Sequence, residues 1–193
     1  MSERKAYSKA ANTGQYDKSS GLLGKYDNVR RFWEDQFTGI FLRPALNDLM
    51  ERKRRNLDRI RILDLGCGSG DGYDLLMGVS TKDPGIYEYI ITAITPDMLR
   101  EYVGLEINED LLKQAEEYHG NHPKMRFIHD DLSNGLPPSV NKSEPFDIYF
   151  TSYGTFSHFH DHQSVKIIAD ICRHAPKRAL LIGDWLGRYS YEW

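Results

Sequence analysis

The chain has 193 residues, a net charge of −3 and 40% hydrophobic residues, values typical of a single globular domain. This charge carries no electrostatic signature of nucleic-acid binding, and no apolar run approaches the roughly 18 residues that span a bilayer. Its two cysteines, Cys67 and Cys172, are far apart in the sequence. We therefore expect a soluble cytoplasmic protein without a structural disulfide and without a nucleic-acid or membrane partner.

The N-terminal part of the chain divides into a polar segment and a helical one. Residues 1–26 show no apolar periodicity, which predicts an N-terminal arm or lid ahead of one domain over residues 27–193. The apolar residues that follow recur at helical spacing as far as Phe41, and Pro44 suits the first turn of a second helix. The basic run Arg52–Arg55 fits the solvated end of that helix better than a nucleic-acid patch.

Apolar segments alternate with helical patterns along the rest of the chain. The predicted strands cover Ile60–Leu65, Tyr102–Glu106, Met125–His129, Phe146–Thr151 and Arg178–Asp184. Asn108 is the expected N-cap of a helix that stops at Gly120, and Asp161 that of a helix from His162 to about His174. This alternation predicts a doubly wound α/β fold, with a mostly parallel sheet and helices on both faces.

The first predicted strand runs into a loop with glycines at positions 66, 68 and 70. Such a bend lets the backbone approach a ligand, because glycine tolerates positive φ and lacks a Cβ atom. Asp64 precedes the loop, where its carboxylate would repel a pyrophosphate but attract an ammonium or sulfonium group. The glycine spacing also differs from the Gly-x-Gly-x-x-Gly of nicotinamide dehydrogenases. The loop therefore favours a nucleotide-like ligand with a cationic end.

Carboxylates also end the second and third predicted strands, at Glu106 and at Asp130 and Asp131. A carboxylate at the end of the second strand can accept hydrogen bonds from both hydroxyls of a ribose; the alternative is a solvent-facing turn residue. Asp131, preferred over Asp130 on position, can take the amino group of an adenine. Its alternative role is to cap its own backbone in a turn.

The region after the fourth predicted strand would border an acceptor pocket. It contains Tyr153 and the histidine-rich stretch His158–His162. We expect no metal there, because the spacing matches no standard zinc pattern and Asp161 already has a role as a helix cap. His158 or Tyr153 would matter as a general base if the acceptor is a hydroxyl group.

Four of these segments together resemble the motifs of class I S-adenosylmethionine-dependent methyltransferases. They are Leu63–Gly70 (LDLGCGSG), Gly104–Asn108, Asp130–Leu132 and Phe146–Ile148, and the resemblance runs from about residue 27 to 187. It implies a Rossmann-like sheet in the order 3-2-1-4-5. It also implies S-adenosyl-L-methionine as the cofactor and S-adenosyl-L-homocysteine as the product.

The resemblance also assigns roles to individual residues. By it, the methionyl end would bind at Asp64, Gly66, Cys67, Gly68 and Gly70, the ribose at Glu106, the adenine at Ile107, Asp131 and the Leu132 backbone, and Thr151 would border the methyl group. An N-terminal lid over the site would include Tyr16 or Tyr26.

The implied reaction is methyl transfer to an oxygen or nitrogen atom of a small-molecule or peptide-like acceptor. Two alternatives stay open: a cofactor-binding protein without transferase activity, and an aminopropyltransferase-like enzyme. The chain departs from the family pattern in lacking the usual strands 6 and 7 and in carrying a long inserted segment over residues 77–100. Thr151–Gly154 also lacks the Asn/Asp-Pro-Pro-Tyr type of motif, which disfavours a nucleobase or glutamine acceptor. The sequence predicts neither the acceptor itself nor the oligomeric state.

Overall fold

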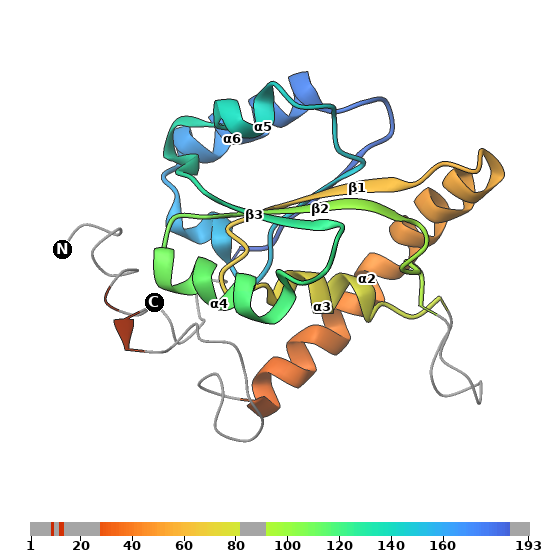
Figure 1. The fold of residues 1–193 in the computed structure, drawn as a ribbon, viewed down its shortest axis with the longest axis horizontal. Helices are drawn as coiled ribbons and strands as arrows, with labels where there is room; N and C mark the ends of the chain where they lie inside the picture. The colour runs from red at the N-terminus through yellow and green to blue at the C-terminus, as the bar shows by residue number, and fades with distance from the viewer. Residues whose placement is uncertain (1–8, 10–11, 14–27, 82–91, 186–193) are drawn as a thin grey trace.

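In the computed structural model, the described residues are 9, 12–13, 28–81 and 92–185 (Figure 1). Within them, a sheet of five parallel strands has helices on both faces. Most of the predicted N-terminal arm, with Tyr16 and Tyr26, lies outside the described residues, as do residues 82–91 of the predicted insertion. Residues 80 and 92, on either side of that gap, pair in an isolated antiparallel bridge.

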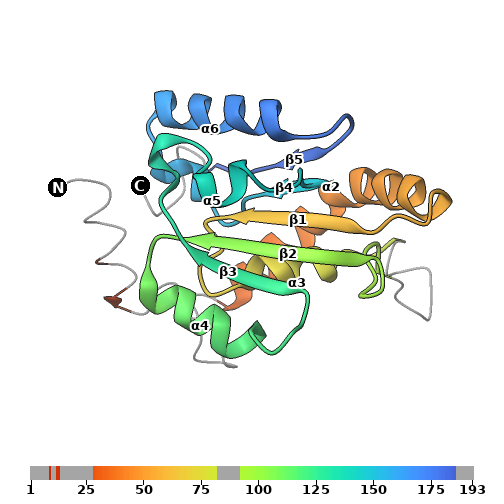
Figure 2. The same cartoon turned by 45° about the horizontal axis from the view of Figure 1, so that its top comes forward.

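The strands follow the predicted order, and all of them run in one direction (Figure 2). They are β1 (Ile60–Leu65), β2 (Leu99–Glu106), β3 (Met125–His129), β4 (Ile148–Phe150) and β5 (Leu180–Ile182), arranged as β3-β2-β1-β4-β5. The chain therefore leaves β1 toward β2 on one side and later returns to β4 on the other. In doubly wound sheets, ligands bind beyond the carboxyl ends of the strands at such a reversal.

The helices divide between the two faces of the sheet (Figure 1). They are α2 (Asn28–Arg55), α3 (Asp71–Met77), α4 (Glu109–His119), α5 (Pro138–Asn141) and α6 (Asp161–His174), with short 3-10 turns η1 (Leu132–Asn134) and η2 (Thr155–His158). Helices α2, α3 and α4 cover one face, whereas α5 and α6 cover the other. Successive β1 side chains alternate between the two cores, Ile62 joining the first and Leu63 the second.

One prediction about the N-terminal helices is wrong, because α2 continues through Pro44. A proline inside a helix costs about 3 kcal/mol through its missing N–H and its steric clash. The side chains that flank it are buried against the sheet: Leu42, Leu46, Leu49 and Met50 are each at most 8% exposed. Burial of each contributes about 1.5–3 kcal/mol, which together exceeds the cost of the proline.

The helix over the first apolar residues is present as predicted, but the residues of this apolar face whose side chains are described are exposed. Phe37, Ile40 and Phe41 are 59%, 52% and 78% exposed. The side chains of Val29, Phe32 and Trp33 lie outside the described residues. The buried stripe of α2 is therefore the one that follows residue 41.

The helix caps confirm one prediction and correct another. The Asn108 side chain accepts hydrogen bonds of 3.0 Å from the backbone N–H groups of Asp110 and Leu111, as an N-cap should. Helix α6 begins one residue earlier than predicted, with His160 at the N-cap and Asp161 in the first turn. The backbone N–H of His160 donates to Oε1 of Gln163, so a side chain from inside the helix closes this end.

Arg61, near the start of β1, ties the sheet to the segment before β4. It is only 7% exposed, and its guanidinium donates to Glu101 on β2 and to the carbonyl oxygens of Glu144 and Pro145. The guanidinium carbon also lies 4.3 Å from the centre of the Phe146 ring. One side chain thus holds three segments that are distant in sequence.

The Arg61→Leu substitution should lower the free energy of unfolding by about 2–3 kcal/mol, because it leaves Glu101 and two carbonyl groups without a buried donor. The matched control is Arg100→Leu, which removes an exposed ion pair with Glu144 and should cost less than about 1 kcal/mol. Urea denaturation measures both values. Equal losses would contradict the assigned role of Arg61.

Candidate functional site

The loop between β1 and α3 lies at the carboxyl edge of the sheet. The backbone N–H groups of Gly66 and Cys67 donate to the carbonyl oxygen of Leu105 on β2, at 2.9 and 2.8 Å. All three loop glycines have positive φ, of 78°, 54° and 88° in chain order. The predicted tight bend is therefore present, and it is fastened to the neighbouring strand.

The loop has packed sides and one open position, Gly68. A Cβ atom on Gly66 would lie 2.6 Å from Cγ2 of Thr155, and one on Gly70 would lie 2.7 Å from Cδ2 of His119. A Cβ atom on Gly68 would meet no heavy atom of the described residues within 4 Å. A ligand can therefore approach the loop backbone at Gly68.

The Asp64 side chain is buried at the end of β1, with no exposed surface. The Tyr102 hydroxyl donates to its Oδ2 atom. The α3 residue above it is Gly72, where a Cβ atom would overlap Oδ2. The other carboxyl oxygen, Oδ1, is buried and has no hydrogen-bond partner among the described residues. Because buried polar atoms are nearly always paired, the unpaired Oδ1 marks a place for a donor that the described residues do not supply.

The pKa of Asp64 is raised from 3.8 to about 7, mainly by burial and also by the nearby charges of Glu106 and Asp184, while the Tyr102 hydrogen bond opposes the rise. All the charged groups that raise this pKa are acidic. A cation that reached Oδ1 would stabilise the carboxylate and lower its pKa. The site therefore suits a positively charged ligand group.

Glu106 lies against the glycine loop rather than in solvent. It is 3% exposed; its Oε2 accepts a 3.0 Å hydrogen bond from the backbone N–H of Gly68, and its Oε1 accepts one of 2.8 Å from Asn108. The alternative of a solvent-facing turn residue is therefore wrong. An ionised carboxylate can accept about four hydrogen bonds, so the same two oxygens can also receive ligand hydroxyls.

The end of β3 is hydrogen-bonded to the end of β2, because the backbone N–H of Asp130 donates to the carbonyl oxygen of Glu106 at 3.1 Å. Asp131 caps η1 by accepting a 2.8 Å hydrogen bond from the backbone N–H of Ser133. This contact is the turn chemistry that we considered as the alternative role. The Leu132 side chain is buried in the core, so its backbone is the part available to a ligand. The carbonyl oxygen of Ile107 contacts His129 Nε2 at 2.9 Å.

Cys67 and Thr151 are both buried at this edge. A Cβ atom on Gly104 would lie 2.7 Å from the Cys67 sulfur, so the side chain packs against β2. Burial, with the charges of Asp64 and Glu106, raises the pKa of the Cys67 thiol well above its usual value, and the thiol stays protonated. Thr151 is 2% exposed, and its hydroxyl oxygen is buried without a hydrogen-bond partner among the described residues.

The two candidate bases follow β4. Tyr153 has a φ of 59° and packs partly buried against the core on the side of α2 and α3. His158 ends η2. The residue from this segment that reaches the glycine loop is Thr155, which sequence reasoning did not single out. Farther along, the rings of His160 and His162 stack at 5.7 Å, and the described residues contain no group of three or more metal-ligating side chains.

Two other residues at the site were missed from the sequence. The Asp184 carboxylate follows β5, accepts a 3.0 Å hydrogen bond from the backbone N–H of Gly154 and acts electrostatically on Asp64. Acidic residues at the carboxyl ends of the first three predicted strands were treated as candidate site residues. The same rule, applied to the fifth predicted strand, would have identified Asp184. Tyr102 carries no such signal, since its contact with Asp64 depends on the pairing of β1 with β2.

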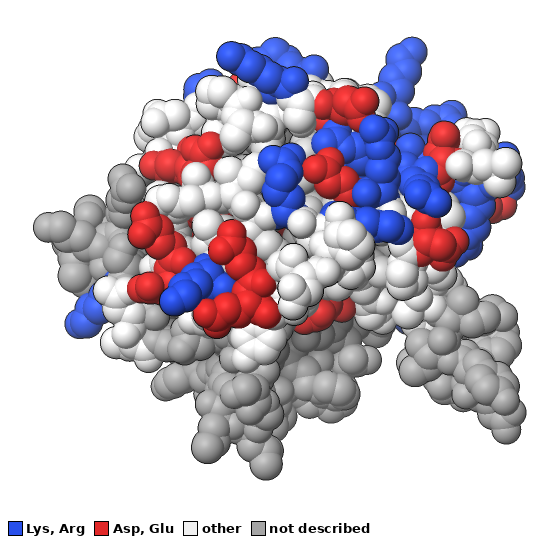
Figure 3. All heavy atoms as spheres, in the orientation of Figure 1, with Lys and Arg blue, Asp and Glu red and all other residues white. Residues whose placement is uncertain are grey.

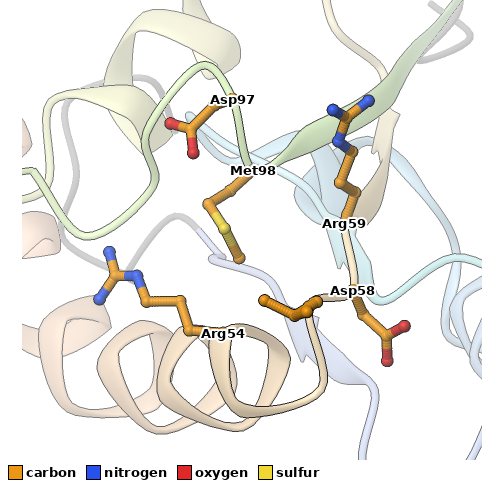
Figure 4. A pocket seen from close by; sticks show the side chains of 6 residues that line it. Arg54, Asp58, Arg59, Asp97 and Met98 are labelled. Atoms are coloured by element: carbon orange, nitrogen blue, oxygen red, sulfur yellow. The ribbon is translucent and has the colours of Figure 1, made fainter.

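A cavity of about 340 Å³ lies at the opposite edge of the sheet, where β1 and β2 begin (Figure 4). Arg54, Leu57, Asp58, Arg59, Asp97 and Met98 line it. Lysine and arginine side chains gather over the nearby end of α2, interspersed with acidic ones (Figure 3). In the basic run, Arg52, Lys53 and Arg55 form ion pairs with Asp48, Asp147 and Glu51. This face is separate from the glycine loop.

A family model described as a methyltransferase domain matches residues 90–177. No curated protein matches the chain, whereas 440 chains of solved structures do. One is the sugar N-methyltransferase KedS8 from Streptoalloteichus sp., 15% identical over 90% of this chain and 61% of that one, with a TM-score of 0.51. Another is DesVI from Streptomyces venezuelae, 13% identical over 84% and 58%, with a TM-score of 0.50.

Residues 90–177 are thus similar to a methyltransferase domain, and the two solved structures share the fold of this chain. The predicted sheet order is confirmed by the observed arrangement of the strands. The family match begins at residue 90, after the glycine loop. A further solved structure, a methyltransferase from Clostridium acetobutylicum, is 16% identical over 72% of this chain and 48% of that one, with a TM-score of 0.47. This chain thus spans about half to three fifths of the length of the three structures.

The described part of the chain contains no helix that is long and apolar enough to cross a membrane.

The Asp64→Asn variant should gain stability over the wild-type protein as the pH rises from 4 to 7. The pKa of Asp64 is raised in the folded state, so the stability it contributes is complete below its unfolded pKa and is lost as the pH rises through the folded pKa. A shift of about three pH units corresponds to about 4 kcal/mol. Urea denaturation of both proteins at several pH values measures the difference.

The matched control is Asp110→Asn, which makes the same change at an exposed position on α4. Its stability relative to wild type should vary little over this pH range. If the difference in stability between Asp64→Asn and wild type were also independent of pH, Asp64 would not have the raised pKa that its buried environment implies.

Proposed function

We propose that this chain binds S-adenosyl-L-methionine at the glycine loop and transfers its methyl group to a small-molecule acceptor. The observation that carries the proposal is the buried Oδ1 of Asp64, which has no hydrogen-bond partner among the described residues, at the end of the strand that leads into the glycine loop. A cofactor with an ammonium and a sulfonium group would provide the donor and the positive charge that this corner lacks. The match of residues 90–177 to a methyltransferase domain supports the same cofactor.

Each predicted cofactor contact has a place in this proposal. Asp64 would hold the ammonium group, and the backbone of Gly66, Cys67, Gly68 and Gly70 would surround the methionyl part. Glu106 would accept the ribose hydroxyls, since its oxygens already face the loop at Gly68.

Ile107 would lie on the adenine, and Asp131 with the Leu132 backbone would contact its edge. Thr151 would border the methyl group.

When bound, the cofactor supplies a methyl group that is already activated on a sulfonium. The contribution of the chain is then to hold the two reactants in line and to exclude water, which can account for about 7–11 kcal/mol of a barrier in well-oriented systems. The acceptor would enter beside the ends of β4 and β5, where Thr151 and Asp184 lie near Asp64. We propose an oxygen or nitrogen nucleophile on this acceptor; one structural neighbour is a sugar N-methyltransferase.

The first test is calorimetric titration with S-adenosyl-L-methionine, followed by a search for labelled methyl groups on small molecules of a cell extract. We expect binding and label transfer. Binding without transfer to any component would instead indicate a cofactor-binding protein. Tighter binding of the decarboxylated cofactor would indicate an aminopropyltransferase-like enzyme.

The Glu106→Gln substitution should weaken cofactor binding by about tenfold or more, because it replaces a charged acceptor of hydrogen bonds by a neutral one that accepts on one side only. Calorimetry with S-adenosyl-L-methionine measures the change. Glu116→Gln makes the same chemical change at an exposed position on α4 and should leave the affinity unaltered. An unchanged affinity of the Glu106 variant would remove this residue from the proposed site.

The proposed bases can be separated by His158→Gln and Tyr153→Phe, once an acceptor is known. Loss of a true general base should lower the rate of transfer by about 10²–10⁴-fold and remove one limb of the pH–rate profile. We expect this for at most one of the two residues, and only for a hydroxyl acceptor. If both variants keep the wild-type profile, transfer proceeds without either base.

A further inference from the structure

The hydrogen bond between Tyr102 and Asp64 joins two completely buried side chains on neighbouring strands. The pairing of Ile62 with Tyr102 and of Asp64 with Gly104 puts both side chains on the same face of the sheet. The Tyr102 ring is also held from α3 and β3, by edge contacts with Tyr73 at 5.3 Å and Phe127 at 6.3 Å. The hydroxyl is therefore fixed in place under the carboxyl group.

Tyr102 acts here as a donor. Burial, together with the charge of Asp64, raises the pKa of the Tyr102 hydroxyl well above its usual value, so it keeps its proton. Its hydrogen bond to Oδ2 is the contact that favours the ionised form of Asp64, against burial and the charges of Glu106 and Asp184. Gly72 on α3 also lies against Oδ2, because a Cβ atom there would overlap it, and the Cys67 thiol in the loop adds no cation.

We propose that Tyr102 is a positioning residue for the cofactor: its hydroxyl occupies Oδ2 of Asp64, leaves Oδ1 for the ammonium group and favours the ionised form of the carboxyl, which binds this cation. The proposal rests on the proposed function, because it needs a cofactor with an ammonium group at Oδ1. It goes beyond it in assigning the pH dependence of binding to a residue that does not touch the cofactor.

A protonated Asp64 must lose its proton before it can pair with an ammonium group, so affinity depends on the ionised fraction of the carboxyl. Without the Tyr102 hydroxyl this fraction is smaller at every pH below the titration range and nearly unchanged above it. The loss of affinity should therefore depend on pH. A tyrosine that only supports the packing of the sheet would cause a loss that is the same at every pH.

The experiment compares Tyr102→Phe with wild type in calorimetric titrations with S-adenosyl-L-methionine from pH 6 to pH 8.5. Removal of a charge-assisted hydrogen bond should raise the pKa of Asp64 by about one unit. The variant should then bind about tenfold more weakly than wild type at pH 6 and less than about twofold more weakly at pH 8.5. Titration of the ammonium group itself affects both proteins equally and cancels in the ratio.

The matched control is Tyr149→Phe. Tyr149 is also a fully buried tyrosine with a hydrogen-bonded hydroxyl, but it belongs to the core on the opposite face of the sheet and contacts His174. Its substitution removes a comparable hydrogen bond without touching Asp64. Its affinity relative to wild type should not vary with pH.

The outcomes separate this inference from the proposed function. If wild type fails to bind S-adenosyl-L-methionine at every pH, the proposed function fails. If wild type binds but the ratio of wild-type to Tyr102→Phe affinity is constant across the pH range, the positioning role is overturned and the proposed function stands. If Tyr102→Phe does not fold, adding Asp64→Asn should restore folding, because a neutral amide needs no charge-stabilising donor; failure to restore it would also overturn the role.

Discussion

The carboxyl group of Asp64 is buried at the end of the central strand, and much of the local structure follows from this burial. An ionised carboxyl in such a place needs donors, because desolvation otherwise favours its neutral form. The adjacent strand supplies one donor from Tyr102, and helix α3 passes above with Gly72, where a larger residue would collide with the carboxyl. The second oxygen has no hydrogen-bond partner among the described residues.

The parallel sheet gathers three acidic groups around this point. Glu106 arrives from β2 and Asp184 from beyond β5, on the two sides of the central strand. Like charges in a buried corner oppose one another, and the raised pKa of Asp64 reflects that opposition as well as burial. A cationic ligand offsets both the cost of burying the Asp64 charge and the repulsion between the acidic groups. The negative charges around Asp64, which repel one another when no cation is bound, thus favour a sulfonium cofactor and disfavour a pyrophosphate.

The sequence patterns succeeded where the signal is local and failed where burial competes with it. Asn108 caps a helix as predicted, because an N-cap is decided by a side chain and the backbone two or three residues away. Pro44 was expected to begin a helix, but the burial of its neighbours on the sheet keeps α2 continuous. Phe41 follows the helical period and is nevertheless exposed. Periodicity shows that a helix is amphipathic, not which face meets the core.

By itself, the sequence determined the alternation of strands and helices, the glycine loop with positive φ, and the acids at the strand ends. These depend on short-range backbone preferences and on the rule that parallel strands end at one edge. The tertiary structure decided which of these acids are buried and what each one touches. The contact of Tyr102 with Asp64 and the unpaired Oδ1 depend on the register of β1 against β2 and on packing from α3. Residues 38 positions apart meet only when the sheet forms, so no local pattern could reveal them.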